Sequence, residues 1–248
     1  MRRLFLVALV LVAAGCGKSS SNGGRGTTTS AVPPPATPTT TTATTNAPQP
    51  KLAIHVYFVR DGRVAPVRRL VPSTPAVGQS ALDELSRGPT TDERAAGLSI
   101  SNGEADLGEL THVSQLAEAQ IVYTLTQFPT VRKVRIGDDV LDRSDLEDVT
   151  PVILVESPLA GETVTSPIAV RGTSNTFEAT MRVEVRRGSA VLVGETVTAS
   201  SGSGERGTFS ATLDVDASPG PITLLAFEPS AENGQPLHMV RIPLTLAG

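Results

Sequence analysis

The chain has 248 residues, a formal net charge of −4 and a single cysteine. This length accommodates two ordinary domains together with segments that have no fold of their own. One cysteine excludes disulfide frameworks and thiolate metal sites, and the mildly acidic balance argues against nucleic acid, or charge-driven adhesion to anionic lipid, as a partner. Any folded region must therefore be held together by burial alone.

The first sixteen residues have the organisation of a bacterial lipoprotein signal. Arg2 and Arg3 precede an apolar run over residues 4–14, which is shorter than the roughly 20 residues that cross a bilayer. Small residues at 13–15 then lead directly into Cys16, as a signal peptidase requires. We therefore predict that the Cys16 thiol accepts a lipid and anchors the chain, extracytoplasmic, to the outer face of the cell membrane. The alternatives are an ordinary signal peptide followed by a chance cysteine, or a cysteine in a buried core.

Residues 17–50 form a low-complexity segment with ten threonines and six prolines. Such a composition does not bury enough apolar surface to offset its ordering entropy, so we expect a disordered spacer. An O-glycosylated stalk is the alternative that a threonine- and proline-rich exported segment leaves open.

The first half of a folded region, expected over residues 51–148, alternates between strand and helix patterns. Residues 51–60 and 63–71 read as two strands joined by a turn at Asp61-Gly62. A helix is expected from residue 77 to the stop at Gly88-Pro89, and Thr90 with Glu93 has the form of a capping box that starts a second, short helix.

The second half of this region contains the clearest helix, over residues 114–128. Before it, Asn102-Gly103 predicts a hairpin; after it, residues 131–136 read as a strand. Ile121 lies on the apolar side of the helix and Gln120 lies off it, so we expect Ile121 to pack on a sheet that includes both the opening strands and residues 131–136. The predicted class is an α+β domain, a mixed sheet with packed helices.

Residues 151–248 show no helical periodicity and instead contain seven short strand patterns. Turn signals separate them, among them Gly172, Gly188 and Asn233-Gly234. Seven short strands in about a hundred residues are typical of an all-β immunoglobulin-like sandwich. The expected strands cover residues 152–155, 168–171, 179–186, 191–198, 208–215, 222–227 and 237–244.

Several of these stretches resemble known domains. AEAQIVYTLTQFPTVRKVRI (117–136), LDELSRGPTTDERAAG (82–97) and IHVYFVRDG (54–62) resemble the GerMN domain, which is named from a spore formation and germination lipoprotein. ESPLAGETVTSPIAVRGTSNTFEATMRVEV (156–185), GTFSATLDV (207–215) and VRIPLTL (240–246) are similar to the immunoglobulin-like domain of bacterial spore germination proteins. The end of the resemblance looks short, because this chain has Gly137-Asp138-Asp139 where the GerMN family has a hairpin after the last strand.

Candidate functional residues are few. No serine, histidine or carboxylate falls into a catalytic motif, and the three histidines lack metal-ligand spacing, so we assign no catalytic, cofactor or metal residue. His55 is expected at the surface or rim of its strand. The acidic run over residues 138–148 is interpreted as a solvated interdomain linker rather than a Ca²⁺ site. A cationic hairpin is the one candidate interaction surface, with a charged, solvated sheet edge as the alternative; it comprises Arg60, Arg63, Arg68 and Arg69.

Together these observations predict a non-catalytic envelope lipoprotein that acts as a binding or assembly module. The resemblance implies a role in sporulation, germination or a cell-wall process. Expected partners are the membrane, through the N-terminal lipid, and other envelope proteins or peptidoglycan; no cofactor and no nucleic acid are expected. A wall-active envelope enzyme and a small-ligand-binding lipoprotein are the alternatives, and a structure distinguishes them by the groups that gather in its clefts.

Overall fold

A computed structural model describes residues 50–101 and 110–248. The predicted lipid acceptor Cys16, the low-complexity segment up to residue 49 and the expected hairpin at Asn102-Gly103 lie outside these residues. Within the described part, no helix is both long enough and apolar enough to cross a membrane.

The N-terminal domain opens with a long hairpin. Strand β1 (Lys51–Arg60) pairs antiparallel with β2 (Arg63–Pro72) over ten residue pairs. The turn residues Asp61 and Gly62 both have positive φ angles, 52° and 70°, as a two-residue turn between twisted strands requires. The predicted hairpin is confirmed at this position.

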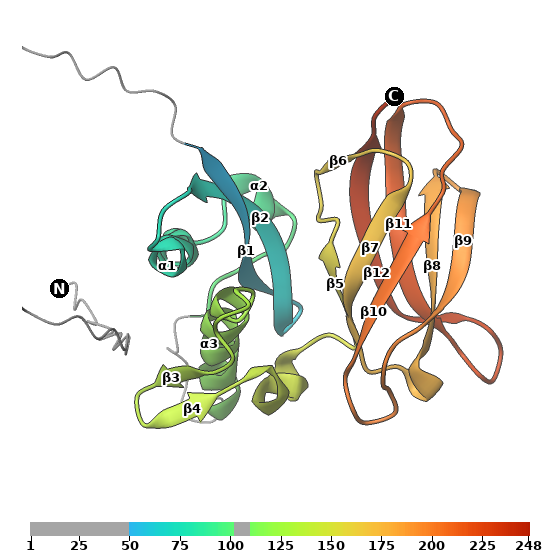
Figure 1. Cartoon of the computed structure of the whole chain (residues 1–248). Helices are drawn as coiled ribbons and strands as arrows, with labels where there is room; N and C mark the ends of the chain where they lie inside the picture. The colour runs from blue at the N-terminus through green and yellow to red at the C-terminus, as the bar shows by residue number, and fades with distance from the viewer. Residues whose placement is uncertain (1–49, 102–109) are drawn as a thin grey trace, which may run out of the picture. The chain divides into compact units, whose positions relative to one another are not determined.

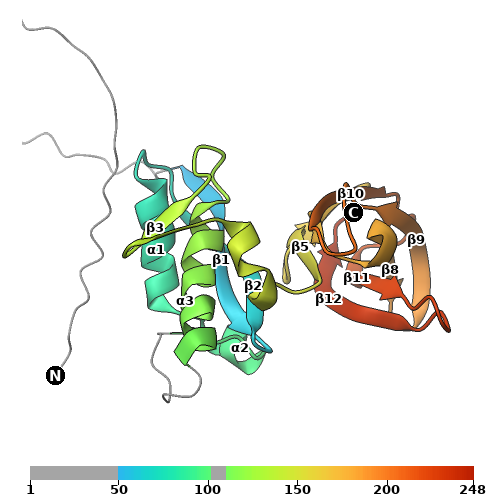
Figure 2. The ribbon, with the colours of Figure 1, turned by 90° about the horizontal axis from the view of Figure 1, so that it is seen from below.

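Three helices complete this domain: α1 (Val77–Arg87), α2 (Thr91–Ala95) and α3 (Leu110–Leu125). Helix α1 ends at Gly88, where φ is +75°. The capping box predicted for α2 is present: Thr90 accepts a hydrogen bond from the backbone N–H of Glu93, and the Glu93 carboxylate accepts one from the backbone of Thr90. Figure 2 shows α1 and α3 side by side, next to β1.

Both faces of β1 are buried, and its sequence accordingly alternates only weakly between apolar and polar residues. Ile54, Val56 and Phe58 pack with Ala81 and Leu85 of α1. Tyr57 and Val59 belong to a second cluster that includes α3 and the element that follows it. A strand buried on both faces reads as a continuous apolar run, which is what residues 56–59 are.

Helix α3 also occupies the edge of β1 that faces away from β2. The Gln127 side chain, just beyond the helix, accepts a hydrogen bond from the His55 N–H at 2.7 Å and donates one to the His55 carbonyl at 2.6 Å. The Tyr57 N–H donates to Thr124 Oγ1, and Val59 exchanges backbone hydrogen bonds with Ser99. The edge of β1 is thus covered by side chains rather than by a third long strand.

The sheet is less extensive than expected. Strand β3 (Val134–Ile136) pairs with β4 (Asp139–Leu141) and not with β1 or β2, so the described strands form two separate antiparallel hairpins. The turn between β3 and β4 is Gly137-Asp138, with Gly137 at φ +59°. A hairpin therefore follows the last predicted strand, at the end that looks short in the sequence.

The acidic run is also folded, not a solvated linker. It forms a short 3₁₀ helix, η1 (Arg143–Val149), in which Leu146 and Val149 are buried. Asp142 starts this helix by accepting hydrogen bonds from the N–H and hydroxyl groups of Ser144. Those bonds, together with Lys133, lower the pKa of Asp142 to about 2.

The position of Gln120 on α3 differs from the sequence interpretation. Gln120 is 1 % exposed, and its carbonyl oxygen accepts a hydrogen bond from the Ser101 N–H at 2.8 Å. Ile121 is only partly buried, but it contacts both apolar clusters of the domain. The helix thus buries a wider sector than its apolar residues alone indicate.

The C-terminal domain is an all-β sandwich, and each of its seven predicted strands is present. One sheet has the order β10-β7-β5 and the other β6-β12-β11-β8-β9 (Figure 1). The strands are β5 (Ile153–Ser157), β6 (Thr163–Val164), β7 (Ile168–Ser174), β8 (Thr180–Arg187), β9 (Ala190–Thr198), β10 (Gly207–Leu213), β11 (Gly220–Pro229) and β12 (Pro236–Leu246).

The core of the sandwich lies between the two sheets and contains alternate residues of most strands. Met181, Val183 and Val185 of β8 are fully buried in it. Gly172 was expected to mark a turn, but it lies inside β7. A Cβ there would come within 2.1 Å of the Leu154 carbonyl oxygen and 2.8 Å of the Phe209 ring, so glycine permits this close packing.

Candidate functional site: a cleft between the two domains

The two domains contact each other through buried polar groups, and both belong to one compact unit. Tyr57 of β1, which is fully buried, donates a hydrogen bond from its hydroxyl to Glu156 of β5. Arg143 of η1 pairs with the same carboxylate at 2.9 Å. A single acidic side chain of the sandwich is therefore held by two groups of the N-terminal domain.

Arg143 is itself fixed by aromatic rings. Its guanidinium lies 4.6 Å from the centroid of the Tyr123 ring and 5.7 Å from that of Tyr57, within the range of cation–π attraction. Burial alone would lower the pKa of Arg143, but its neighbours Tyr57 and Glu156 outweigh burial and raise the pKa. Burial, reinforced by Glu156, also raises the pKa of Tyr57 well above its ordinary value, so the phenol stays a hydrogen-bond donor.

A second polar contact joins η1 to the sandwich. Glu147 accepts two hydrogen bonds from Arg206, at 2.7 and 3.0 Å, and one from Asn175 at 2.9 Å. Burial on its own would raise the pKa of Glu147, but the hydrogen bonds from Arg206 and Asn175 lower it. Arg206 also donates to the carbonyl of Pro151, where the chain passes from one domain to the other.

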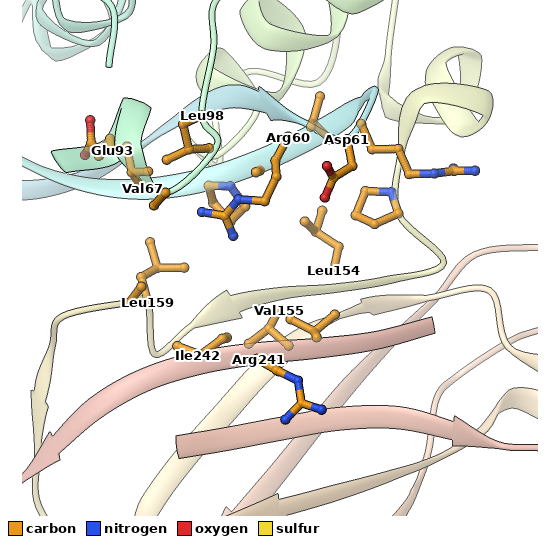
Figure 3. Close-up of a pocket in the computed structure, with 18 of the residues that line it drawn as sticks. Arg60, Asp61, Val67, Glu93, Leu98, Leu154, Val155, Leu159, Arg241 and Ile242 are labelled. Atoms are coloured by element: carbon orange, nitrogen blue, oxygen red, sulfur yellow. The ribbon is translucent and has the colours of Figure 1, made fainter. Parts of the chain in front are cut away.

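Beside these contacts the domains leave a cleft of about 610 Å³ (Figure 3). Its walls come from β2 and α2 on one side and from β5, β12 and the loop after β5 on the other. The walls are largely apolar; they include Val67, Leu98, Val155, Leu159 and Ile242. A concave, mainly apolar site with a few polar groups is the usual form of a binding site.

The charged groups of the cleft differ in whether they have a partner within the chain. Arg60 is exposed and has no hydrogen-bond or ion-pair partner among the residues that the structure describes, and Figure 3 shows its guanidinium in the space between the two walls. Glu93 also lines the cleft, but Arg69 binds both of its carboxylate oxygens. Arg241 lines the cleft as well, but in Figure 3 its side chain points away from Arg60, so we take Arg60 as the cationic group that faces an occupant of the cleft.

The cationic hairpin of the sequence analysis is brought only partly to one site. Arg63 donates to the carbonyls of Asp148 and Thr150 at the end of η1, whereas Arg68 pairs with Glu162 of the sandwich at 3.0 Å and so joins the domains. Arg69 is bound to Glu93 and lies 5.6 Å from the centroid of the Phe58 ring. These three arginines already have partners within the chain, and the interaction surface expected at the hairpin stays a prediction.

The β2 edge that faces away from β1 is poorly suited to pairing with another strand. In β1, residues 55, 57 and 59 direct their backbone groups away from β2, so their partners in the register also face outward. Those partners are Val64, Pro66 and Arg68. Proline has no N–H to donate, so the ladder is interrupted in the middle of this edge.

His55 and the possible metal ligands were the other positions that the sequence analysis considered. His55 is partly buried instead of exposed, and burial lowers its pKa despite the opposing charges of Glu156 and Glu162. Across the described residues no group of three or more His, Cys, Asp or Glu side chains is arranged to hold a metal ion.

Most residues that build the site were missed by sequence reasoning. Tyr57, Arg143 and Glu156 belong to three different elements, and no spacing relates them. One local signal was present: Asp142 and Asp145 have the i, i+3 arrangement of a capping box, which marks the start of η1. A helix start inside an acidic run indicates a folded junction instead of a linker.

Comparison with known proteins supports the assignment of both domains. Residues 55–137 match a family described as "Sporulation and spore germination", and residues 152–235 match the "Immunoglobulin-like domain of bacterial spore germination". Neither description names an enzymatic activity. The comparison with curated proteins found no match.

Among solved structures, the fibronectin(III)-like modules of Clostridium thermocellum CbhA are similar at 18 % identity, with a TM-score of 0.26. The likeness covers 38 % of this chain and 93 % of the other. The chain thus matches a model of sporulation and spore germination domains and then one of immunoglobulin-like domains of bacterial spore germination, and the strand order of its C-terminal part fits a β sandwich.

Proposed function

We propose that this chain is an envelope lipoprotein that acts as a binding or assembly module in a sporulation- or germination-related process, with the interdomain cleft as its binding surface. The observation that carries this proposal is that both domains supply the walls of one apolar cleft and are held beside it by Tyr57, Arg143 and Glu156. A surface fixed in advance binds with less loss of conformational entropy.

The partner that suits this site is another envelope component, a protein or a peptidoglycan strand. The apolar walls and the unpaired guanidinium of Arg60 match a segment that presents apolar groups and one acidic group. The two spore germination domains support the process, and the signal-like sequence ending in Cys16 supports the location.

A small-ligand receptor is the second candidate, because the cleft volume falls within the range of about 300–1,000 Å³ that small-molecule pockets have. The two candidates differ in what a crosslinking group placed in the cleft should capture. A small ligand would leave no macromolecule attached to a crosslinking group placed in the cleft.

The test places a photo-crosslinking amino acid at Ala96, an exposed position that lines the cleft, in intact cells. The matched control position is Val191 on β9, which is exposed and lies outside the cleft residues. We expect one defined envelope protein or glycan adduct at position 96 and none at 191. The adduct should disappear when Ala160→Trp fills the cleft. Identical adducts at both positions, or none at 96, would contradict the proposal.

The anchor is tested separately. Replacing Cys16 by Ser should prevent lipidation, because a hydroxyl is a far weaker nucleophile than a thiolate. We expect the variant to leave the membrane fraction or to remain uncleaved, and mass spectrometry of the unchanged chain should find lipid on Cys16. A wild-type chain without lipid on Cys16 would contradict the location but not the role of the cleft.

A further inference from the structure

The outer face of the five-stranded sheet carries three arginines on β8 and β12, the two strands that flank β11. On β8, residues 181, 183 and 185 point into the core, so Arg182, Glu184 and Arg186 point to the opposite face. Leu225 of β11 lies opposite Glu184 on one side and Arg241 of β12 on the other. We call Arg182, Arg186 and Arg241, with the space between them, the arginine face.

Glu184 orients two of these arginines. Although it lies on the outer face, Glu184 is only 5 % exposed. Its Oε1 accepts a hydrogen bond from Arg182 Nε at 2.8 Å, and its Oε2 accepts two from Arg186, at 2.8 and 2.5 Å. Burial would raise the pKa of Glu184, but the bonds from Arg182 and Arg186 lower it, so the carboxylate stays charged.

These bonds leave donors of both guanidinium groups unused. Within the described residues, Arg182 uses only Nε and Arg186 leaves Nη1 without a partner. Gly194 of β9, opposite Glu184, makes room for this arrangement: a Cβ there would lie 2.8 Å from Arg182 Nη2 and 2.9 Å from the Glu184 side chain. Glu184 thus fixes each guanidinium group through one side, and the N–H groups on the other side remain free to donate to a ligand.

Arg241 adds a third cation to the face. It is exposed and makes no hydrogen bond or ion pair with any part of the chain that the structure describes, and in Figure 3 its side chain points away from Arg60 and Leu98. Three arginines and one glutamate give the face a formal charge of +3 − 1 = +2. The whole chain has a charge of −4, so this face is positive on an acidic protein.

We propose that the arginine face binds a polyanionic polymer whose backbone carries phosphodiester groups. Guanidinium groups donate paired hydrogen bonds to phosphate oxygens, and the buried Glu184 holds two of them in position before binding. Arg241 also lines the interdomain cleft, but its side chain points away from Arg60, and the proposal does not depend on the function proposed for the cleft.

An acidic protein fits this face less well. Protein interfaces take most of their binding energy from apolar and aromatic anchors in pockets. The apolar residues beneath the arginines, Leu225 and Phe227, are 1 % and 8 % exposed, so they offer no anchor. A polymer recognised through its phosphates needs only oriented charges and an open surface.

The test measures binding of poly(glycerol phosphate) to the chain lacking only residues 1–16, as a function of NaCl concentration. Affinity should fall steeply with salt, because binding releases counterions. Arg182→Gln, Arg186→Gln and Arg241→Gln should each weaken binding about five- to tenfold and make the salt dependence shallower. The control is Arg171→Gln, which removes an exposed arginine from the other sheet and should leave binding unchanged.

The Glu184→Gln variant distinguishes binding by oriented arginines from binding by positive charge alone. This variant raises the charge of the face by one, so attraction by charge alone predicts tighter binding, whereas our proposal predicts weaker binding because the guanidinium groups lose their orientation. Tighter binding by Glu184→Gln, or equal losses for Arg171→Gln and Arg182→Gln, would overturn the proposal. So would stronger binding of poly-glutamate or of phosphatidylglycerol vesicles than of the polymer.

Discussion

The C-terminal domain encloses its core between two sheets of alternating strands. In the N-terminal domain, by contrast, the strands within residues 50–101 and 110–149 form only two-stranded hairpins, and helices close the core. In the sandwich, each strand has regular neighbours for its backbone groups. In the N-terminal domain, side chains such as Gln127 and Thr124 satisfy the edge of β1. A sheet with few strands thus depends on individual side chains where a larger sheet depends on a repeated ladder.

The largest effect expected from a single change in the sandwich is at Gly172. Gly172→Ala places a Cβ 2.1 Å from the Leu154 carbonyl oxygen, and a backbone atom in a paired strand has little freedom to move. We expect a loss of about 3 kcal/mol or more in the free energy of unfolding. Chemical denaturation is the measurement.

Gly78→Ala is the matched change in the N-terminal domain. A Cβ there meets only the Leu125 side chain at 3.7 Å, an ordinary contact, and Gly78 lies inside α1. It should be neutral or stabilise by about 0.5–1 kcal/mol. Equal destabilisation by the two changes would show that close packing in the sandwich is not what requires Gly172.

The next effect concerns the contact that joins the domains. Glu156→Ala removes the acceptor of both the Tyr57 hydroxyl and Arg143. We expect a loss of about 2–3 kcal/mol in the free energy of unfolding, because the buried Tyr57 hydroxyl is left without an acceptor and the partly buried Arg143 loses its counter-charge. Limited proteolysis should convert a single resistant fragment, residues 51–248, into two separate ones.

Glu195→Ala is the control for this change, since Glu195 is exposed on β9 and has no partner in the described part of the chain. It should alter stability by no more than about 0.5 kcal/mol. Two fragments already present in the unchanged chain would show that the interdomain contacts do not hold in solution.

Ile121→Ala tests the core of the helical domain. Ile121 contacts both apolar clusters but is only partly buried. We therefore expect the free energy of unfolding to fall by about 2 kcal/mol, near the low end for isoleucine-to-alanine changes in a core. Val191→Ala, at a position 49 % exposed on the sandwich, should change the free energy of unfolding by no more than about 0.5 kcal/mol. Indistinguishable denaturation midpoints for the two variants would contradict the packing of α3.

The smallest effect is on the pH dependence of the second interdomain contact. The pKa of Glu147 is lowered in the folded chain, so its carboxylate stabilises the fold above its ordinary pKa of 4.5 and this contribution is lost as the pH falls through the lowered value. Because the pair is partly exposed, we expect less than about 1 kcal/mol. The difference in the free energy of unfolding between wild type and Arg206→Gln should shrink from pH 6 to pH 3. A constant difference over this range would contradict a stabilising role for the ionised Glu147.

The comparison of the two domains also explains what the sequence could predict. The strands of the sandwich were predictable because burial on one face produces an alternation that is visible within each segment, as in residues 180–187. The cap of α2 and the turn at Asp61-Gly62 were predictable for a similar reason, since their chemistry lies within four residues.

Burial of Gln120 and the place of Gly172 were not predictable, because both depend on what another segment brings to them. Ser101 satisfies the Gln120 carbonyl, and Leu154 with Phe209 crowds Gly172. The candidate site is of the same kind. Its walls and its polar contacts come from five or more elements, and only the cationic character of Arg60 was visible locally.

Pro66, at the middle of the outward edge of β2, has a further consequence for molecules that stand close together. Unprotected edges let identical chains join strand to strand into growing ribbons. With its central backbone donor missing, this edge cannot propagate such a ribbon. Copies of the chain that lie close together would therefore not join into a ribbon through this edge of β2.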